Sequence, residues 1–367
     1  MKRYIRRIIV FALFLPLILE VSVRLFLPQQ LLRLDNYFVS DDGLGRVPAP
    51  NMDTRVNTGE GEVRYITNER GDRIGHESSG TASLRILALG DSFLQALQVN
   101  YEETMTARTE SLLAMSLGKT VKIDNTGSAN FDSPQYSILM QRRLAQEDYD
   151  MVLVFFYSGN DFVEERRDYY EAQKPSQRVF RFPPQALTWN AIRRDILIPA
   201  ADFLESQSHF FSLIKLQSSS LMNRLGVTGH SLPAPLLRKS AASKMWSVTG
   251  AILNDIKQEG TKHNIPVIIV LLPTIYAVEL DKLSALIDQY GLTVDDIDLQ
   301  QPSRAMISYA QQYGLDIVDL TGAFRESYLA NHSRLFGRVD SHFTPAGHEL
   351  AANTLTPYLL TILKGQH

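Results

Sequence analysis

Five short apolar runs, each followed by a polar turn, constrain the fold of this chain most strongly. Helical patterns separate them, and apolar strands that alternate with amphipathic helices are typical of a parallel sheet covered by helices on both faces. We therefore expect an α/β fold built around such a sheet. The expected strands span residues 84–89, 121–124, 151–156, 267–272 and 317–320. The expected helices span residues 104–115, 133–145, 244–263, 303–313 and 345–363.

Two regions lie outside this alternation. Residues 164–243 are rich in Arg, Gln, Ser and Pro, with scattered aromatic side chains, and predict an irregular helical insertion that forms a lid or groove over one edge of the sheet. Residues 28–82 are polar and rich in glycine, and residues 63–67 predict a strand of a small β hairpin within an extended stalk. The main domain is therefore expected to span residues 83–367.

The N-terminus predicts a transmembrane anchor or signal over residues 1–27. Four basic residues within the first seven positions precede an apolar stretch that Glu20 interrupts. If residues 8–27 form one helix, it is about 30 Å long, which is the thickness of a bilayer core. Glu20 and Arg24, four residues apart, are expected to pair on one face of this helix.

The position of these basic residues predicts the orientation of the chain. By the positive-inside rule, the N-terminus stays in the cytoplasm, and the body lies in the periplasm or outside the cell, held by a single pass through a bacterial inner membrane. A cleaved signal peptide and a buried soluble helix are the alternatives. No Ala-x-Ala cleavage site follows the apolar run, which favours an uncleaved anchor.

Composition excludes several classes of protein. Because the chain of 367 residues has no cysteine, it has no disulfide framework, thiol nucleophile, cysteine zinc site or lipoprotein-type acyl group. Its net charge of −3 predicts no basic surface for nucleic acid. The length is sufficient for one large core with an inserted subdomain.

A serine follows the first expected strand at a sharp turn. The run Gly90-Asp91-Ser92-Phe93 begins where the apolar residues 84–89 end. Such a strand-to-helix junction holds a serine at the carboxyl edge of a sheet, where α/β proteins place their chemistry. Ser92 is therefore a candidate nucleophile, and the alternative is that its hydroxyl only caps the following helix.

Three further polar motifs occur in a fixed order after this serine. They are Asn125-Thr126-Gly127-Ser128-Ala129-Asn130, Ser158-Gly159-Asn160-Asp161 and Asp340-Ser341-His342-Phe343-Thr344-Pro345-Ala346-Gly347-His348. Together with the Ser92 motif, they make residues 84–363 resemble the SGNH, or GDSL, hydrolase superfamily. The resemblance implies a flavodoxin-like three-layer α/β/α sandwich, and an esterase, lipase, thioesterase, carbohydrate deacetylase or acyltransferase activity.

The residue types fit a serine hydrolase. A serine hydroxyl is a poor nucleophile until a base takes its proton, and His342 is the candidate base. Asp340 is the candidate carboxylate that fixes the tautomer and orientation of this histidine. The backbone N–H of Ser92 and the side-chain amide of Asn160 are candidate donors to the oxyanion. This chemistry needs no metal and no organic cofactor.

Two details depart from the family pattern. The resemblance implies a third oxyanion donor, usually the N–H of a glycine five residues after the asparagine that ends the second strand. Counting from Asn125 gives Asn130, which we favour because asparagine tolerates left-handed backbone angles, and Gly127 is the alternative. Only one residue separates Asp340 from His342, whereas the family usually has two.

Structural roles are the alternative for several of these side chains. Asn160 could be an ordinary loop residue. Asp340, His342 and His348 could form a metal site, but no other histidine or carboxylate cluster has ligand spacing, so we expect His348 to pack or hydrogen-bond at the start of the last helix. The two carboxylates expected to brace backbone turns near the site are Asp91 and Asp161.

The sequence therefore predicts a membrane-anchored serine esterase. It would hydrolyse short acyl esters such as acetyl, on a small molecule or a cell-envelope carbohydrate, through an acyl-enzyme. Its expected partners are that substrate, the membrane through residues 8–27, and other polysaccharide-modifying proteins of the envelope. The alternatives are an O-acetyltransferase of a cell-surface polysaccharide with the same triad, and a catalytically silent envelope scaffold.

Overall fold

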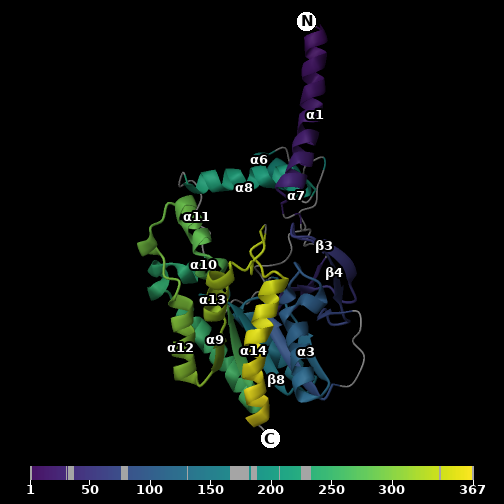
Figure 1. Cartoon of the computed structure of the whole chain (residues 1–367). Helices are drawn as coiled ribbons and strands as arrows, with labels where there is room; N and C mark the ends of the chain where they lie inside the picture. The colour runs from purple at the N-terminus through teal and green to yellow at the C-terminus, as the bar shows by residue number, and fades with distance from the viewer. Residues whose placement is uncertain are drawn as a thin grey trace.

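The central element of the structure, a computed structural model, is a mixed β-sheet (Figure 1). The structure describes residues 2–29, 31, 37–75, 82–129, 131–165, 182, 188–205, 207–224, 233–338 and 340–365. Within these residues the sheet has eight strands in the order β10-β9-β8-β6-β7-β5-β4-β3. Its strands are β3 (Asp53–Asn57), β4 (Glu62–Thr67), β5 (Arg73–Ile74), β6 (Leu84–Gly90), β7 (Val121–Asn125), β8 (Met151–Tyr157), β9 (Val267–Leu272) and β10 (Asp316–Asp319).

Five of these strands are parallel, and they are the five that the apolar runs predicted. Numbered by their order along the chain, β6 to β10 lie side by side as 2-1-3-4-5. This is the order of flavodoxin-like doubly wound sheets. Strand β6 lies between β7 and β8, so the loops that follow these three strands meet at one carboxyl edge. In sheets of this order, that edge is where ligands bind.

Helices cover both faces of the parallel strands, as predicted. Because successive side chains of a strand point to opposite faces, β8 contributes Leu153 and Phe155 to one core and Val154 and Phe156 to the other. The first core packs against α3 (Met105–Leu117), α13 (Thr321–Asn331) and α14 (Pro345–Gly365). The second packs against α4 (Ser133–Leu144), α9 (Met245–Lys262) and α12 (Gln301–Tyr313). Further α-helices in the described part of the body are α2 (Ser92–Gln95), α10 (Ile275–Val278) and α11 (Leu280–Tyr290).

Residues 37–75 do not form the stalk that the sequence predicted. The hairpin strand predicted at residues 63–67 is present as part of β4, which pairs antiparallel with β3 and β5. Strand β5 then joins β7 where Arg73 pairs with Asn125, so the three strands extend the central sheet. A separate hairpin joins β1 (Phe38–Asp41) to β2 (Gly45–Pro48). The prediction of a stalk was wrong because the polar, glycine-rich composition of this segment reflects tight turns between short strands.

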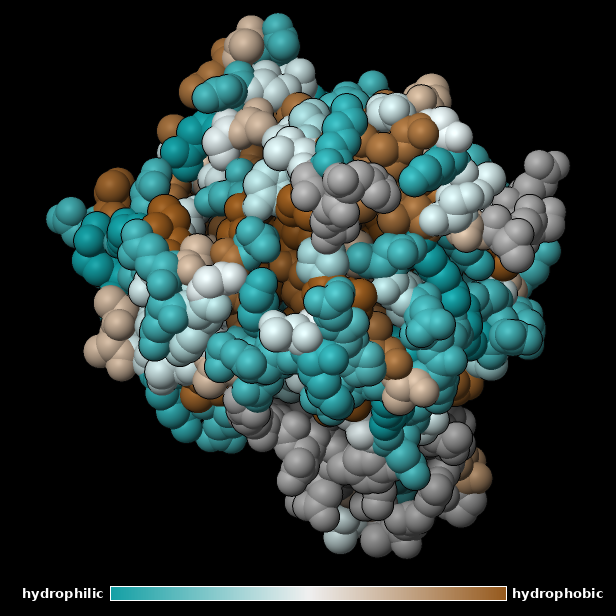
Figure 2. Space-filling view, turned by 90° about the horizontal axis from the view of Figure 1, so that it is seen from below, coloured by the Kyte–Doolittle hydropathy of each residue, from teal (hydrophilic) through white to brown (hydrophobic). Residues whose placement is uncertain are grey.

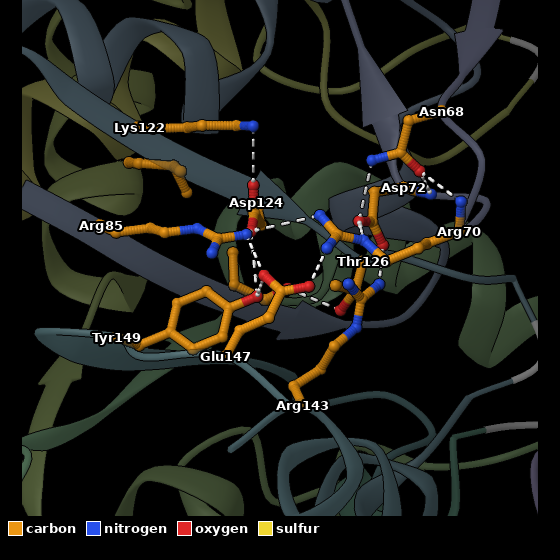
Figure 3. Close-up of polar contacts among 12 residues, drawn as sticks. Asn68, Arg70, Asp72, Arg85, Lys122, Asp124, Thr126, Arg143, Glu147 and Tyr149 are labelled. Atoms are coloured by element: carbon orange, nitrogen blue, oxygen red, sulfur yellow. Dashed lines mark hydrogen bonds and ion pairs between the residues drawn. The ribbon is translucent and has the colours of Figure 1, made fainter. Parts of the chain in front are cut away.

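A cluster of charged side chains fixes this segment to the sheet (Figure 3). Asp72, just before β5, forms a buried ion pair with Arg143 of α4. Arg70 pairs with Glu147, and Arg85 of β6 lies 2.6 Å from Asp124 of β7. Because the cluster joins the β4–β5 turn to two parallel strands and a helix, residues 37–75 belong to the body of the molecule.

The N-terminal helix α1 (Lys2–Phe26) projects away from the body (Figure 1). The predicted ion pair is present, with Arg24 Nη2 3.0 Å from Glu20 Oε1. Glu20 also accepts hydrogen bonds from the backbone N–H groups of His209 and Phe210, at 3.1 and 3.0 Å. Among the described helices, none has both the length and the apolar character needed to cross a membrane.

The region predicted as a helical insertion contains α6 (Trp189–Ile192), α7 (Ile198–Glu205) and α8 (His209–Arg224). These helices lie across the end of the body from which α1 projects (Figure 1). Residues 166–181, 183–187, 206 and 225–232 of this region lie outside the described residues, so its role as a lid stays a prediction. At the opposite end of the body, hydrophilic residues predominate around smaller hydrophobic areas (Figure 2).

Candidate active site

Ser92 is the first residue of the short helix α2, at the carboxyl edge of the sheet. The turn forms because Asp91 caps the helix, its carboxylate accepting the N–H of Phe93 at 2.9 Å. The helix ends after one turn at Ala96, which has a left-handed φ of 54°. Ser92 is thus held where β6 ends, between the ends of β7 and β8.

The structure brings Ser92, His342 and Asp340 together. The Nε2 atom of His342 lies 2.7 Å from the Oγ atom of Ser92. Its Nδ1 atom is hydrogen-bonded to Oδ1 of Asp340, and the backbone N–H of His342 donates to the same oxygen at 3.2 Å. The single residue between Asp340 and His342 therefore allows their contact, because the side chain of Asp340 folds back onto the histidine.

Aromatic side chains hold the plane of the His342 ring. The ring of Phe93 packs against it with centroids 4.5 Å apart, and the ring of Tyr157 stacks on the same phenylalanine with centroids 4.1 Å apart. Phe93 also meets the edge of Phe343, the residue after the histidine. The serine hydroxyl thus contacts an oriented imidazole, which in turn contacts a carboxylate. This arrangement activates a serine as a nucleophile.

The electrostatics of the site favour an ion pair between His342 and Asp340. Burial by itself would lower the pKa of His342, but the hydrogen bond and the charge of Asp340 outweigh it and raise this pKa above 6.5. Burial would likewise raise the pKa of Asp340, but hydrogen bonds from His342 and Gln98 hold this pKa below 3.8. Asp340 is therefore ionised at neutral pH, as its orienting role requires.

The loop after β7 was predicted to supply an oxyanion donor. The N–H of Gly127 donates to the side chain of Asn125 at 3.0 Å, so this N–H is used within the loop, and the alternative of Gly127 as the donor stays a prediction. The N–H groups of Ser128 and Ala129 are also used, by Gly90 and Gln95. Asn130 lies outside the described residues, and its role stays a prediction.

Asn160 is exposed in the loop that follows β8. Because β8 is the neighbour of β6, and Gly90 is in register with Phe155, the loops that carry Asn160 and Ser92 leave the sheet at the same edge. This placement is compatible with a shared oxyanion site, and the donor role of Asn160 stays a prediction.

Three side chains predicted to have structural roles have them. Asp161 accepts hydrogen bonds from the hydroxyl of Tyr136 and the N–H of Tyr157, both at 2.7 Å, and Asp91 caps α2. His348 accepts the N–H of Met105, the first residue of α3, at 3.2 Å. In the part of the chain that is described, no group of three or more His, Cys, Asp or Glu residues could hold a metal ion.

Sequence reasoning missed two residues that contact Asp340. The amide of Gln98 donates to Oδ2 of Asp340 at 2.7 Å, and Oε1 of Glu60 accepts the backbone N–H of Asp340 at 3.2 Å. Gln98 follows α2, and Glu60 lies in the turn between β3 and β4. No motif marks either residue, because both contacts join segments that are more than 200 positions apart.

Comparison with known proteins gives no family assignment. No family model matches the chain, and no curated protein matches it. A lipolytic G-D-S-L protein from Veillonella parvula is 11% identical, with a TM-score of 0.40, over 75% of this chain and 97% of that chain. An acetyl xylan esterase, AlAXEase, is 14% identical, with a TM-score of 0.42, over 75% of this chain and 99% of its own.

A third structure, the esterase EstA from Pseudoalteromonas sp., is 9% identical, with a TM-score of 0.40, over 76% of this chain and 98% of its own. These identities and scores are too low to carry an argument about activity. The functional conclusion therefore rests on the geometry around Ser92.

Proposed function

We propose that this protein is a serine hydrolase of the SGNH type that cleaves short acyl esters through an acyl-enzyme. The observation that carries the proposal is the contact of Ser92 Oγ with His342 Nε2 at 2.7 Å, on a histidine whose other nitrogen is bound to Asp340. The flavodoxin-like sheet supports it, because it presents Ser92 at the edge where such sheets bind ligands.

In the proposed mechanism, Ser92 Oγ attacks the ester carbonyl carbon while His342 Nε2 takes the hydroxyl proton. Asp340 stabilises the resulting imidazolium. The N–H of Ser92, with Asn130 and Asn160, donates to the oxyanion. His342 then protonates the departing alcohol, and a water molecule, deprotonated by the same nitrogen, releases the carboxylic acid from Ser92.

The test uses the full-length chain beside Ser92→Ala. We expect the native protein to hydrolyse p-nitrophenyl acetate and to react with a fluorophosphonate probe, and the variant to do neither. An acyl group trapped on Ser92 in a quenched reaction would identify the covalent intermediate by mass spectrometry. Equal background rates from two well-folded proteins, with no labelling of Ser92, would favour the silent scaffold.

We also propose an acetylated carbohydrate of the bacterial cell envelope as the substrate, with the body outside the inner membrane. Four basic residues at the N-terminus, followed by exposed apolar side chains such as Phe14, Ile18 and Leu25, support attachment through residues 8–27. Protease accessibility in spheroplasts tests the orientation, since a body in the periplasm is digested without lysis. Acetate release from acetylated glycan tests the substrate, and transfer of acetyl to an added oligosaccharide would instead indicate an O-acetyltransferase.

A further inference from the structure

We propose that Gln98 is a positioning residue for Asp340, and that residues 37–75 hold both residues in place through Glu60 and Arg73. This inference rests on the proposed function, because it assigns these residues to the triad. It gives the N-terminal strands a part in the active site, which nothing in their sequence indicated.

Gln98 completes the hydrogen bonding of the Asp340 carboxylate. One oxygen, Oδ1, is bonded to His342, and the other, Oδ2, accepts the amide of Gln98 at 2.7 Å. Donors on both oxygens prevent the carboxylate from rotating away from the histidine. The orientation of the Gln98 amide follows from chemistry, because the reversed amide would place its oxygen against a carboxylate.

Glu60 holds the backbone of the loop that carries the triad. Its Oε1 accepts a hydrogen bond from the backbone N–H of Asp340 at 3.2 Å, and its Oε2 accepts one from the guanidinium of Arg334 at 3.1 Å. Gly337 allows this approach, since a Cβ atom there would lie 2.6 Å from Oε1 of Glu60. A side chain of the β3–β4 turn is thus built into the loop between α13 and α14.

Arg73 holds the loop that carries Gln98. Its side chain is only 1% exposed, and its guanidinium donates to the carbonyl oxygens of Gln95 at 2.6 Å and of Val99 at 2.5 Å. It also donates to the carbonyl of Ala96. These acceptors lie on both sides of Gln98, so strand β5 fixes the backbone from which this side chain reaches Asp340.

The contacts of Gln98, Glu60 and Arg73 explain how Asp340 is held in place although only one residue separates it from His342. The local turn at Asp340 binds only one carboxylate oxygen. Gln98 binds the other oxygen, and Glu60 binds the backbone N–H of the same residue. The contacts to Oδ2 and to the backbone N–H of Asp340 are therefore made by a residue whose backbone Arg73 holds and by a residue of the β3–β4 turn, so both depend on residues 37–75.

The test compares Gln98→Met and Gln98→Glu with Gln312→Met, an exposed glutamine of α12, in the full-length protein. We expect kcat for p-nitrophenyl acetate to fall about 10-fold in Gln98→Met with KM unchanged, since the side chain positions the base without touching substrate. Gln98→Glu should lose more, because it places a like charge against Asp340. The control should match the native enzyme.

A second measurement does not depend on turnover. The Nδ1 proton of His342, hydrogen-bonded to Asp340, should give a downfield proton NMR signal that shifts or broadens in both Gln98 variants and not in the control. If the native protein is inactive and unlabelled, the proposed function fails while this signal still tests the positioning. Native kcat together with an unchanged signal in Gln98→Met would overturn the inference.

The contribution of the N-terminal strands is tested with Glu60→Ala against Glu62→Ala, an exposed residue nearby in the same hairpin. We expect only Glu60→Ala to lower kcat, with KM and the urea midpoint near those of the native protein. If both variants lose kcat because they unfold, Glu60 is needed only for folding and does not position the triad.

Discussion

At the residue scale, the charge state of His342 decides when Ser92 can be activated. Asp340 raises the pKa of this histidine above 6.5, and a general base acts only in its neutral form. The proposed esterase should therefore lose activity as the pH falls through this raised pKa. Its kcat/KM is expected to reach half its maximum at a pH above 6.5.

Asp340→Asn should change both the rate and its pH dependence. Without the carboxylate, the pKa of His342 falls and the acid limb of kcat/KM moves to lower pH. The rate itself should fall by ~10,000-fold, as in other Ser-His-Asp triads, because the tautomer is no longer fixed. Profiles between pH 5 and 9 measure both effects, with the exposed Asp288→Asn as control. An acid limb that stays in place would show that another group sets it.

Asp91 makes a pH-dependent contribution to stability. Burial raises its pKa to about 6, although the hydrogen bond from Phe93 acts in the opposite direction. Because the folded state binds this proton more tightly than the unfolded state, stability is lost as the pH rises from about 4 to 6. Asp91→Asn keeps a capping oxygen and removes the buried charge.

We therefore expect Asp91→Asn to raise the free energy of unfolding at pH 7.5 by an amount on the order of 2 kcal/mol, and to leave it near the native value at pH 4. Urea unfolding at the two pH values measures the difference. Asp148→Asn, at an exposed aspartate, should show no such change. A variant less stable than the native protein at pH 7.5 would contradict the interpretation.

At the scale of single elements, the strands and helices with apolar runs or repeats were predicted well, and the strands of mixed polar and apolar residues were not. The five parallel strands and helices α3, α4, α9, α12 and α14 begin and end within a few residues of the prediction. A strand buried on both faces is a continuous apolar run, and a helix of three turns repeats its apolar side often enough to be recognised. Strands β1, β2, β3 and β5 mix polar and apolar residues over two to five positions and show no such pattern.

The close contact between the loop after β7 and helix α2 predicts that adding one methyl group at Gly127 affects stability and activity. A Cβ atom at Gly127 would overlap the backbone of Gln95 and lie 2.6 Å from the carbonyl carbon of Leu94. Gly127→Ala should therefore displace the helix of Ser92, lower the free energy of unfolding by about 1–3 kcal/mol and reduce activity.

Gly322→Ala is the matched control, because that helical glycine has open space around its Cβ position. Alanine is favoured over glycine in a helix, so this variant should be as stable as the native protein or slightly more stable. Thermal unfolding and p-nitrophenyl acetate hydrolysis of both variants compare the two sites. Equal behaviour would show that the loop can adapt to the extra carbon.

At the scale of the whole molecule, the charged cluster joins residues 37–75 to the parallel sheet (Figure 3). Arg143 and Asp72 are both nearly excluded from solvent, with side chains 6% and 3% exposed. Removing one partner of a buried pair leaves an uncompensated charge, so Arg143→Met should lower the free energy of unfolding by about 3–5 kcal/mol.

Arg55→Met removes an exposed pair with Glu62 in the same segment and should cost less than about 1 kcal/mol. Urea unfolding of both variants measures the contrast. If both variants unfold at the native midpoint, residues 37–75 are not stabilised by this cluster, and their place in the sheet depends on strand pairing alone.

The sequence by itself determined the α/β alternation and the three residues that meet at the edge of the sheet. This is possible because apolar periodicity is local, and because serine, histidine and aspartate carry their chemistry as residue types. Only the tertiary structure decided that the polar N-terminal segment joins the sheet, that Gly127 uses its N–H internally, and that Gln98 and Glu60 bind Asp340. Those outcomes depend on contacts between segments far apart in the chain, which leave no pattern in the residues around them.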